Sequence, residues 1–128
     1  MGDALIDAAR SVQLKAYAPY SRFLVGAALE ADDGRIFTGC NVENASYGVT
    51  NCAERVALGG AVSAGARKFR RIVIATDAEP PSAPCGACRQ MLAEFGDIAV
   101  EAVSPKGARA WRLSELLPSS FGPGDLGR

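Results

Sequence analysis

The sequence predicts an α/β protein in three layers (α/β/α), with helices on both faces of a mixed five-stranded sheet. The first observation is the order of the periodic segments, which runs helix, two strands, helix, strand, helix, strand, strand. The second is that two strand–helix–strand units stand in the middle of this order, and such units join parallel strands. The third is size, because 128 residues of which 48% are apolar can build a core without disulfide bonds. We therefore expect residues 1–128 to form a single domain.

The N-terminal part is predicted to form a helix and then a hairpin. Apolar residues at helical spacing indicate a helix over residues 4–16, which Pro19 ends. The largely apolar run 23–31 is typical of a strand, and the Asp-Gly pair within 32–35 indicates a tight turn. Residues 35–43 then return as the second strand of the hairpin.

The rest of the chain, after residue 43, is predicted to alternate between helices and strands. Its predicted elements are, in order, a helix at 52–65, a strand at 70–77, a helix at 85–96, strands at 98–103 and 109–113, and a short helical turn at 114–118. Gly65 and Gly96 close the two helices. The pair Gly59-Gly60 inside the first of them costs about 1 kcal/mol per residue against alanine. It indicates close packing against another helix, which could belong to another subunit, or simple sequence drift.

Charge and hydropathy argue against several classes of function. The number of lysines and arginines equals the number of aspartates and glutamates, so the net charge is zero. The chain therefore lacks the excess positive charge that binding to nucleic acid or a membrane surface requires. No apolar run approaches the roughly 20 residues that a membrane-spanning helix needs. The N-terminus lacks the basic and apolar segments of a signal peptide. We therefore expect a cytoplasmic protein with reduced thiols.

The chain has four cysteines and no histidine. Mechanisms that pair serine or cysteine with histidine are therefore unavailable, and any zinc must be held by thiolates or carboxylates. Clustered cysteines in a reducing compartment indicate a metal or catalytic site more often than disulfides.

Three of the cysteines stand at predicted helix starts. Cys85 and Cys88 are spaced i, i+3 in the first turn after Pro84, so both thiols lie on one face. Cys52 opens the preceding helix, and helix N-termini favour thiolates. If the two N-termini converge, three thiolates can hold one zinc ion and leave the fourth position to water, as in catalytic zinc sites.

Charged residues follow these cysteines closely. Glu54 can reach the fourth position and act there as a general acid and base toward water. Zinc with three thiolates carries a net negative charge, which a nearby cation would offset. Arg55 and Arg89 each follow a cysteine motif, and we expect at least Arg55 to donate a hydrogen bond to a ligand sulfur.

These residues carry a family resemblance. The string "CAER" followed by "PCGACRQ" resembles the signature of the zinc nucleoside and nucleotide deaminases, in which Cys-x-Glu or His-x-Glu precedes Pro-Cys-x-x-Cys. The strings "YSRFLVGAAL", "GCNVENASYG" and "LLPSSF" extend the likeness to the small homotetrameric cytidine deaminases, over about residues 17–126. The resemblance implies the cytidine-deaminase-like form of the predicted fold.

The resemblance also implies a role for each matching residue. Cys52, Cys85 and Cys88 match the zinc ligands, with one Zn²⁺ per subunit, and Glu54 matches the proton shuttle. In this family zinc-bound hydroxide attacks C4 of the cytosine ring, while the glutamate protonates N3 and helps the amino group to leave as ammonia. The matches to substrate-binding positions are Asn41 and Glu43 for the sugar hydroxyls, Phe23 for the nucleoside pocket, and Ala45, Tyr47 and Phe121 for an active site in a neighbouring subunit.

The expected function is therefore zinc-dependent hydrolytic deamination of cytidine and 2′-deoxycytidine to uridine and 2′-deoxyuridine, in pyrimidine salvage. The expected assembly is a homotetramer with shared active sites, and the expected partner is a small nucleoside rather than nucleic acid or a membrane. Asn41 and Glu43 are two residues apart at a strand end, so we expect both side chains to point to one face.

Other interpretations of the same residues remain open. Cys85-x-x-Cys88 alone could be a dithiol redox pair. Cys40 could be the fourth ligand of a structural zinc site, although we favour a small buried residue on a strand. A non-catalytic zinc module would have no use for Glu54. Blasticidin-type deaminases share the cysteine core, but "NVENASYG" resembles the sugar-binding segment of the nucleoside enzymes.

Overall fold

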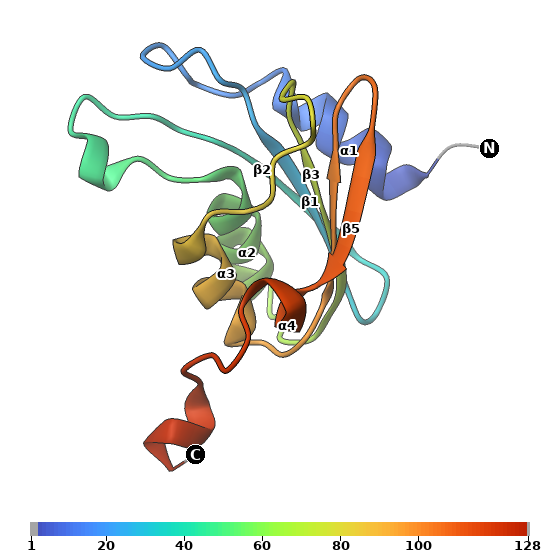
Figure 1. The fold of residues 1–128 in the computed structure, drawn as a ribbon, viewed down its shortest axis with the longest axis vertical. Coiled ribbons are helices and arrows are strands. Elements are labelled where there is room, and N and C mark those ends of the chain that lie inside the picture. Colours follow the sequence, from blue (N-terminus) through green and yellow to red (C-terminus); the bar gives the residue numbers. More distant parts are fainter. Residues whose placement is uncertain (1–2, 128) are drawn as a thin grey trace.

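A computed structural model describes residues 3–127, and its helices and strands follow the predicted order (Figure 1). The elements are α1 (Ala4–Gln13), β1 (Gly26–Ala31), β2 (Ile36–Cys40), α2 (Ala53–Ser63), β3 (Phe69–Ala75), α3 (Gly86–Ala93), β4 (Ala99–Val103), β5 (Ala108–Arg112) and α4 (Leu113–Leu116). Two 3₁₀ turns, at Tyr47–Val49 and Pro123–Leu126, were not predicted. None of the helices described has the length and apolar character to span a bilayer.

The strands form one mixed five-stranded sheet in the order β2-β1-β3-β4-β5, which confirms the predicted fold class. β1 pairs antiparallel with both β2 and β3, so β2 and β3 run in the same direction on either side of it. β3 and β4 are parallel neighbours, and β5 is antiparallel to β4. Both strand–helix–strand units therefore join parallel strands, although only β3 and β4 are hydrogen-bonded to each other.

Helices cover both faces of this sheet, so the molecule has the three layers predicted (Figure 1). Alternate residues of β1 and β3 point to opposite faces. Leu29 and Ile72 pack with α2 and α3 in the larger core cluster, whereas Ala28 and Val73 pack with α1 in the smaller one. α2 and α3, the helices that carry the cysteines, therefore share one face.

The first helix is shorter than predicted. α1 ends at Gln13 rather than at residue 16, so Pro19 does not end it. The chain leaves the helix because Tyr17 pairs with the segment that follows β2. The N–H of Tyr17 donates to the carbonyl oxygen of Asn41 at 3.0 Å, and the N–H of Glu43 donates to the carbonyl oxygen of Tyr17 at 2.9 Å.

The predicted hairpin is also shorter than expected at its open end. β1 begins at Gly26 instead of residue 23, and β2 ends at Cys40 instead of residue 43. At this point the N–H of Val25 donates to the side-chain oxygen of Asn41 at 2.9 Å, so a side chain replaces a backbone partner. The remaining elements match their predicted ranges to within about three residues.

Glycines mark two close approaches between helices and the hairpin. A Cβ on Gly26 would collide with the backbone of α1, and one on Gly39 would lie 2.5 Å from a backbone nitrogen of α2. Gly59 and Gly60 differ, because both are exposed and a Cβ on either would meet nothing within 4 Å outside its own helix backbone. No helix of the described chain packs there, so packing of this pair against another subunit remains a prediction.

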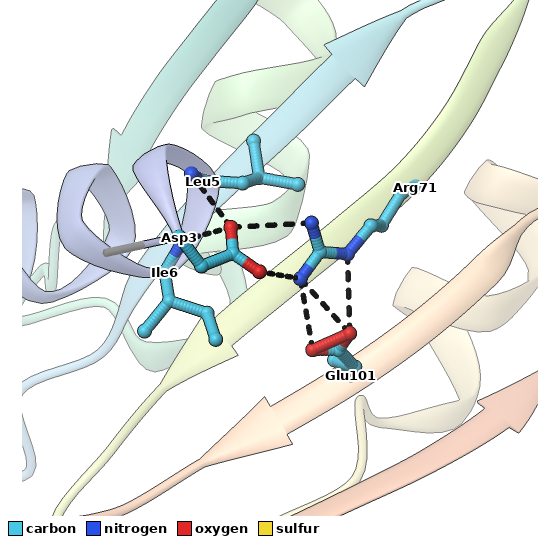
Figure 2. A network of polar contacts seen from close by, with 5 residues as sticks. All are labelled: Asp3, Leu5, Ile6, Arg71 and Glu101. Carbon is cyan, nitrogen blue, oxygen red and sulfur yellow. Dashed lines mark hydrogen bonds and ion pairs between the residues drawn. The ribbon is translucent and has the colours of Figure 1, made fainter. Parts of the chain in front are cut away.

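Arg71 on β3 links the start of α1 to β4 (Figure 2). Its guanidinium donates to both oxygens of Asp3, at 3.2 and 2.5 Å, and to both oxygens of Glu101, at 3.1 and 3.0 Å. Asp3 also accepts from the N–H groups of Leu5 and Ile6 and thereby caps α1. The hydrogen bond from Arg71 lowers the pKa of Asp3, and the two carboxylates raise the pKa of Arg71.

Arg71→Met should lower the free energy of unfolding by about 1 kcal/mol at neutral pH, because it removes the charge and keeps the apolar stem. Since folding lowers the pKa of Asp3, its contribution is present above the unfolded pKa of 3.8 and is lost as the pH falls below that value. Urea unfolding should therefore show the difference from wild type shrinking below about pH 4.

The matched control is Arg70→Met on the same strand. It breaks an exposed pair with Asp32, at 3.6 Å, and should cost less than about 0.5 kcal/mol. Equal losses in the two variants, or a difference for Arg71→Met that grows in acid, would contradict the assigned role of the network.

Candidate metal centre and active site

Three cysteine side chains meet at one edge of the sheet. β2 and β3 run in the same direction, so the loops that follow them lead to the same edge, and α2 and α3 both begin there. Cys52 is the N-cap of α2, Cys85 is the N-cap of α3, and Cys88 lies in the first turn of α3. Their Sγ atoms all lie within 4.8 Å of one another, and those of Cys85 and Cys88 are 3.5 Å apart.

These sulfur positions fit a tetrahedral zinc ion. Zn–S bonds of about 2.3 Å at tetrahedral angles place sulfurs about 3.8 Å apart. The 3.5 Å between Cys85 and Cys88 is close to this distance, and the other separations, all within 4.8 Å, are compatible with it. Cys40 is not part of the cluster and lies half-buried at the end of β2, so the expectation that it is buried was wrong. Three thiolates leave one zinc coordination position for water or substrate. The N-termini of α2 and α3 favour the ionised thiols.

The thiols of α3 differ in their surroundings. Burial raises the pKa of Cys88, and the negative charges of Glu54 and Cys52 raise it further. Burial also acts to raise the pKa of Cys85, but hydrogen bonds from Cys88 and from the N–H of Ala87 outweigh it, so this pKa is lowered. Zinc binds thiolates, so its binding would take a proton from Cys88 in particular.

Glu54 lies in the first turn of α2 with its side chain almost fully buried. It lines a cavity of about 240 Å³ together with Cys52 and Cys85. Burial raises the pKa of the Glu54 carboxyl, because the charged form loses its hydration. A carboxyl that protonates readily beside an open metal position can take a proton from one atom and return it to another.

Arg55 lies against the cluster. Its Nη2 donates to the Sγ of Cys52 at 3.6 Å and to the carbonyl oxygen of Thr50 at 3.2 Å, while its Nε is buried without a hydrogen-bond partner in residues 3–127. A cation at this point offsets the negative charge of the three thiolates. Arg89 donates instead to two backbone carbonyls, at 2.7 and 2.8 Å, one of them that of Pro84. It therefore holds the loop before α3 and does not reach a sulfur.

Comparison with known proteins identifies the family. Residues 2–103 match the family described as "Cytidine and deoxycytidylate deaminase zinc-binding region". The chain belongs to this deaminase family. A cytidine deaminase of Sporosarcina psychrophila is 46% identical over 97% of this chain and 93% of that protein. The crystal structure of cytidine deaminase from Burkholderia pseudomallei matches with a TM-score of 0.89 at 50% identity, and the match covers 94% of this chain and 100% of that one.

Three of the residues predicted to bind the nucleoside lie near the cluster. Phe23 and Asn41 line the same cavity as Cys52 and Cys85. Glu43 lines an adjoining cavity of about 330 Å³, and Thr50 borders both cavities. The side chain of Asn41 is hydrogen-bonded to the backbone of Phe23 and Val25, and that of Glu43 to the backbone of Tyr20 and Ser21.

Ala45, Tyr47 and Phe121 do not line the cavity that holds the cysteines. All three are exposed, Tyr47 at 75% and Phe121 at 59%. Tyr47 borders the adjoining cavity, and its ring packs edge-to-face on that of Tyr20, with centroids 6.1 Å apart. Phe121 belongs to the C-terminal segment that extends beyond α4 (Figure 1), where Gln90 donates to its carbonyl oxygen at 2.9 Å.

Several residues of the cavity wall were not predicted from the sequence. They come from the segment before β1, the loop before α2 and the start of that helix, the end of β3 and the residue after it, and the loop before α3, and are Val25, Thr50, Asn51, Ala53, Ile74, Thr76, Ser82 and Ala83. Thr76 directly follows β3, and ligands of open α/β sheets bind outside the carboxyl ends of strands, so that rule could have found it. Ser82 and Ala83 lie in a Pro-rich loop whose path depends on distant contacts.

Proposed function

We propose that this protein catalyses the zinc-dependent hydrolytic deamination of cytidine and 2′-deoxycytidine to uridine and 2′-deoxyuridine, with release of ammonia. The observation that carries the proposal is the buried carboxyl of Glu54, which shares a cavity with convergent thiols. A structural zinc site has no use for a buried carboxyl beside an open position. A dithiol redox pair has no use for Cys52. Membership of the deaminase family supports the same reaction.

Each group at the centre has a distinct task. Cys52, Cys85 and Cys88 would hold one zinc ion per chain, which when bound supplies Lewis acidity that makes water a nucleophile toward C4 of the cytosine ring. Glu54 takes the proton that the water gives up and delivers it to N3. It then takes the proton of the hydroxyl formed at C4 and delivers it to the 4-amino group, which leaves as ammonia. Its raised pKa suits this task, because the carboxyl must hold the proton between steps.

We assign recognition of the nucleoside to Phe23, Asn41 and Glu43. The amide and the carboxylate can accept hydrogen bonds from sugar hydroxyls, and a substrate without those hydroxyls leaves them unpaired. Phe23 is 41% exposed at the cavity in the single chain, so a bound nucleoside would cover its ring.

The proposed assembly is a homotetramer. Ala45, Tyr47 and Phe121 are exposed away from the chain's own cysteines, and in the tetramer they would reach the active sites of neighbouring subunits. Light scattering should give a mass of four chains for the active protein. A fully active monomer would contradict shared sites.

We place the protein in the cytoplasm and in pyrimidine salvage. All four cysteines are free thiols, and a thiolate metal site is best kept in a reducing compartment. Uracil nucleosides, the proposed products, are substrates of salvage reactions.

The test of this function is ammonia release from cytidine by the zinc-loaded protein, with 2′-deoxycytidine, free cytosine and the two nucleoside monophosphates in parallel. We expect turnover of both nucleosides. Turnover of the nucleotides alone would reassign the substrate within the family. Release from none of them, with zinc bound and the protein folded, would overturn the proposal.

Arg55→Ala should weaken zinc binding or lower kcat by about 10- to 100-fold, as loss of a partner of a metal ligand commonly does. The reason is that the thiolate cluster loses the cation beside Cys52. The measurements are zinc affinity by chelator competition and the pH–rate profile. Arg67→Ala at the other end of α2, where Arg67 donates to backbone carbonyls, is the control. If Arg55→Ala changed neither measurement, the assigned role would be abandoned.

A further inference from the structure

The carboxylate of Glu43 is held by the turn that precedes β1. Its Oε1 accepts from the N–H of Tyr20 at 3.0 Å and from the N–H of Ser21 at 3.1 Å. Its Oε2 accepts a hydrogen bond from the hydroxyl of Ser21. The hydrogen bond from the Ser21 hydroxyl lowers the pKa of Glu43, which keeps the carboxylate ionised and able to accept.

This arrangement leaves the carboxylate of Glu43 with little capacity to accept further hydrogen bonds. A carboxylate has about four lone-pair positions. Within residues 3–127, two positions of Oε1 and one of Oε2 are occupied by donors of the turn. The remaining position, on Oε2, is the one beside the Ser21 hydroxyl. Glu43 can therefore accept one sugar hydroxyl without breaking its existing hydrogen bonds, and the direction of that position is set by Ser21.

Ser21 also connects Glu43 to the wall of the cysteine cavity. Its Oγ accepts from the N–H of Phe23 at 3.0 Å, so its single hydrogen is directed to Glu43. The carbonyl oxygen of Phe23 accepts from Nδ2 of Asn41 at 2.8 Å, and Oδ1 of Asn41 accepts from the N–H of Val25 at 2.9 Å. The three residues assigned to the nucleoside thus belong to one hydrogen-bonded network.

The turn itself is held in a defined conformation. Arg22, between Ser21 and Phe23, has a φ of 60°, in the left-handed region that a non-glycine residue rarely adopts. Its N–H donates to the carbonyl oxygen of Ala18 at 2.9 Å. Residues held in such conformations are commonly found where a ligand site needs a fixed geometry.

We propose that Ser21 is a positioning residue that directs the carboxylate of Glu43 at one sugar hydroxyl and thereby sets the preference among nucleosides that differ in that hydroxyl. This inference rests on the proposed deaminase function. Ser21 acts through Glu43 and takes no part in the proton transfers of Glu54. Its loss should therefore change KM far more than kcat.

The experiment compares wild type with Ser21→Ala on cytidine, 2′-deoxycytidine and 3′-deoxycytidine. The deoxynucleoside that wild type uses less well identifies the hydroxyl that Glu43 accepts. For nucleosides that carry this hydroxyl, Ser21→Ala should raise KM by about three- to tenfold and change kcat by less than about twofold. For the nucleoside without it, KM should stay unchanged, so the discrimination ratio falls.

Four further variants serve as controls. Ser21→Thr retains the hydroxyl and should restore the wild-type ratio. Glu43→Gln combined with Ser21→Ala should have the KM of Glu43→Gln alone, because Ser21 acts through that side chain. Ser11→Ala, an exposed serine of α1, controls for a general effect of the substitution.

A rise in KM that is equal for all three nucleosides would overturn the inference and leave a structural role for Ser21. So would additive effects in the double variant, or wild-type constants in Ser21→Ala. In each case wild type still deaminates cytidine, so these outcomes are distinct from failure of the proposed function, in which wild type releases no ammonia.

Discussion

Glu54→Gln should lower kcat for cytidine by about 10²- to 10⁴-fold while the zinc content stays unchanged. Glutamine has the same size and keeps a hydrogen-bonding side chain, but it cannot take up and return a proton. We expect a loss near the upper end of this range, because the same carboxyl is proposed to serve more than one transfer. The measurement is ammonia release at matched zinc content.

Stability controls separate loss of chemistry from loss of structure. Burial raises the pKa of Glu54, so its ionised form opposes folding at neutral pH. The neutral amide should leave the Tm of the metal-free protein unchanged or higher. Glu30→Gln on β1, outside the cavity, should retain activity. Full activity in Glu54→Gln would overturn the proton-shuttle assignment, and loss of zinc in that variant would assign the residue to metal retention.

Cys85→Ala should abolish stoichiometric zinc binding and activity together, because two thiolates cannot complete the site. Cys85 is exposed at the start of α3, so its truncation leaves no cavity in the core. Zinc binds the folded protein, so a chelator should lower the Tm of wild type. The Tm of Cys85→Ala should already be low and should not respond to the chelator.

Cys40→Ala is the matched control for this experiment. Cys40 lies on β2 outside the thiol cluster, so the variant should keep one zinc ion per chain and the chelator response of wild type. Zinc retained in Cys85→Ala would remove Cys85 from the ligand set. Zinc lost from Cys40→Ala would mean that a closed four-cysteine site forms when metal binds.

Much of the fold followed from patterns within single segments. Hydrophobic periodicity reports which face of a helix or strand is buried, so it predicted the order of elements even where their ends were wrong. Two of the ends that were predicted wrongly by three residues, those of α1 and β2, lie where Tyr17 and Asn41 pair outside the regular ladder. Such pairings join residues far apart in the sequence, and local propensity does not encode them.

The candidate site also has features that local spacing predicts and features that depend on the fold. The sequence alone predicted that Cys85 and Cys88 lie on one side of a helix start and that Glu54 lies in the same turn as Cys52, because helical spacing is a local property. That these two helix starts meet could not be read from spacing, since it depends on the common direction of β2 and β3 in the folded sheet. The tertiary structure also decided that the hydroxyl of Ser21 reaches a carboxylate 22 residues away, a contact that depends on how the loops at one sheet edge pack together.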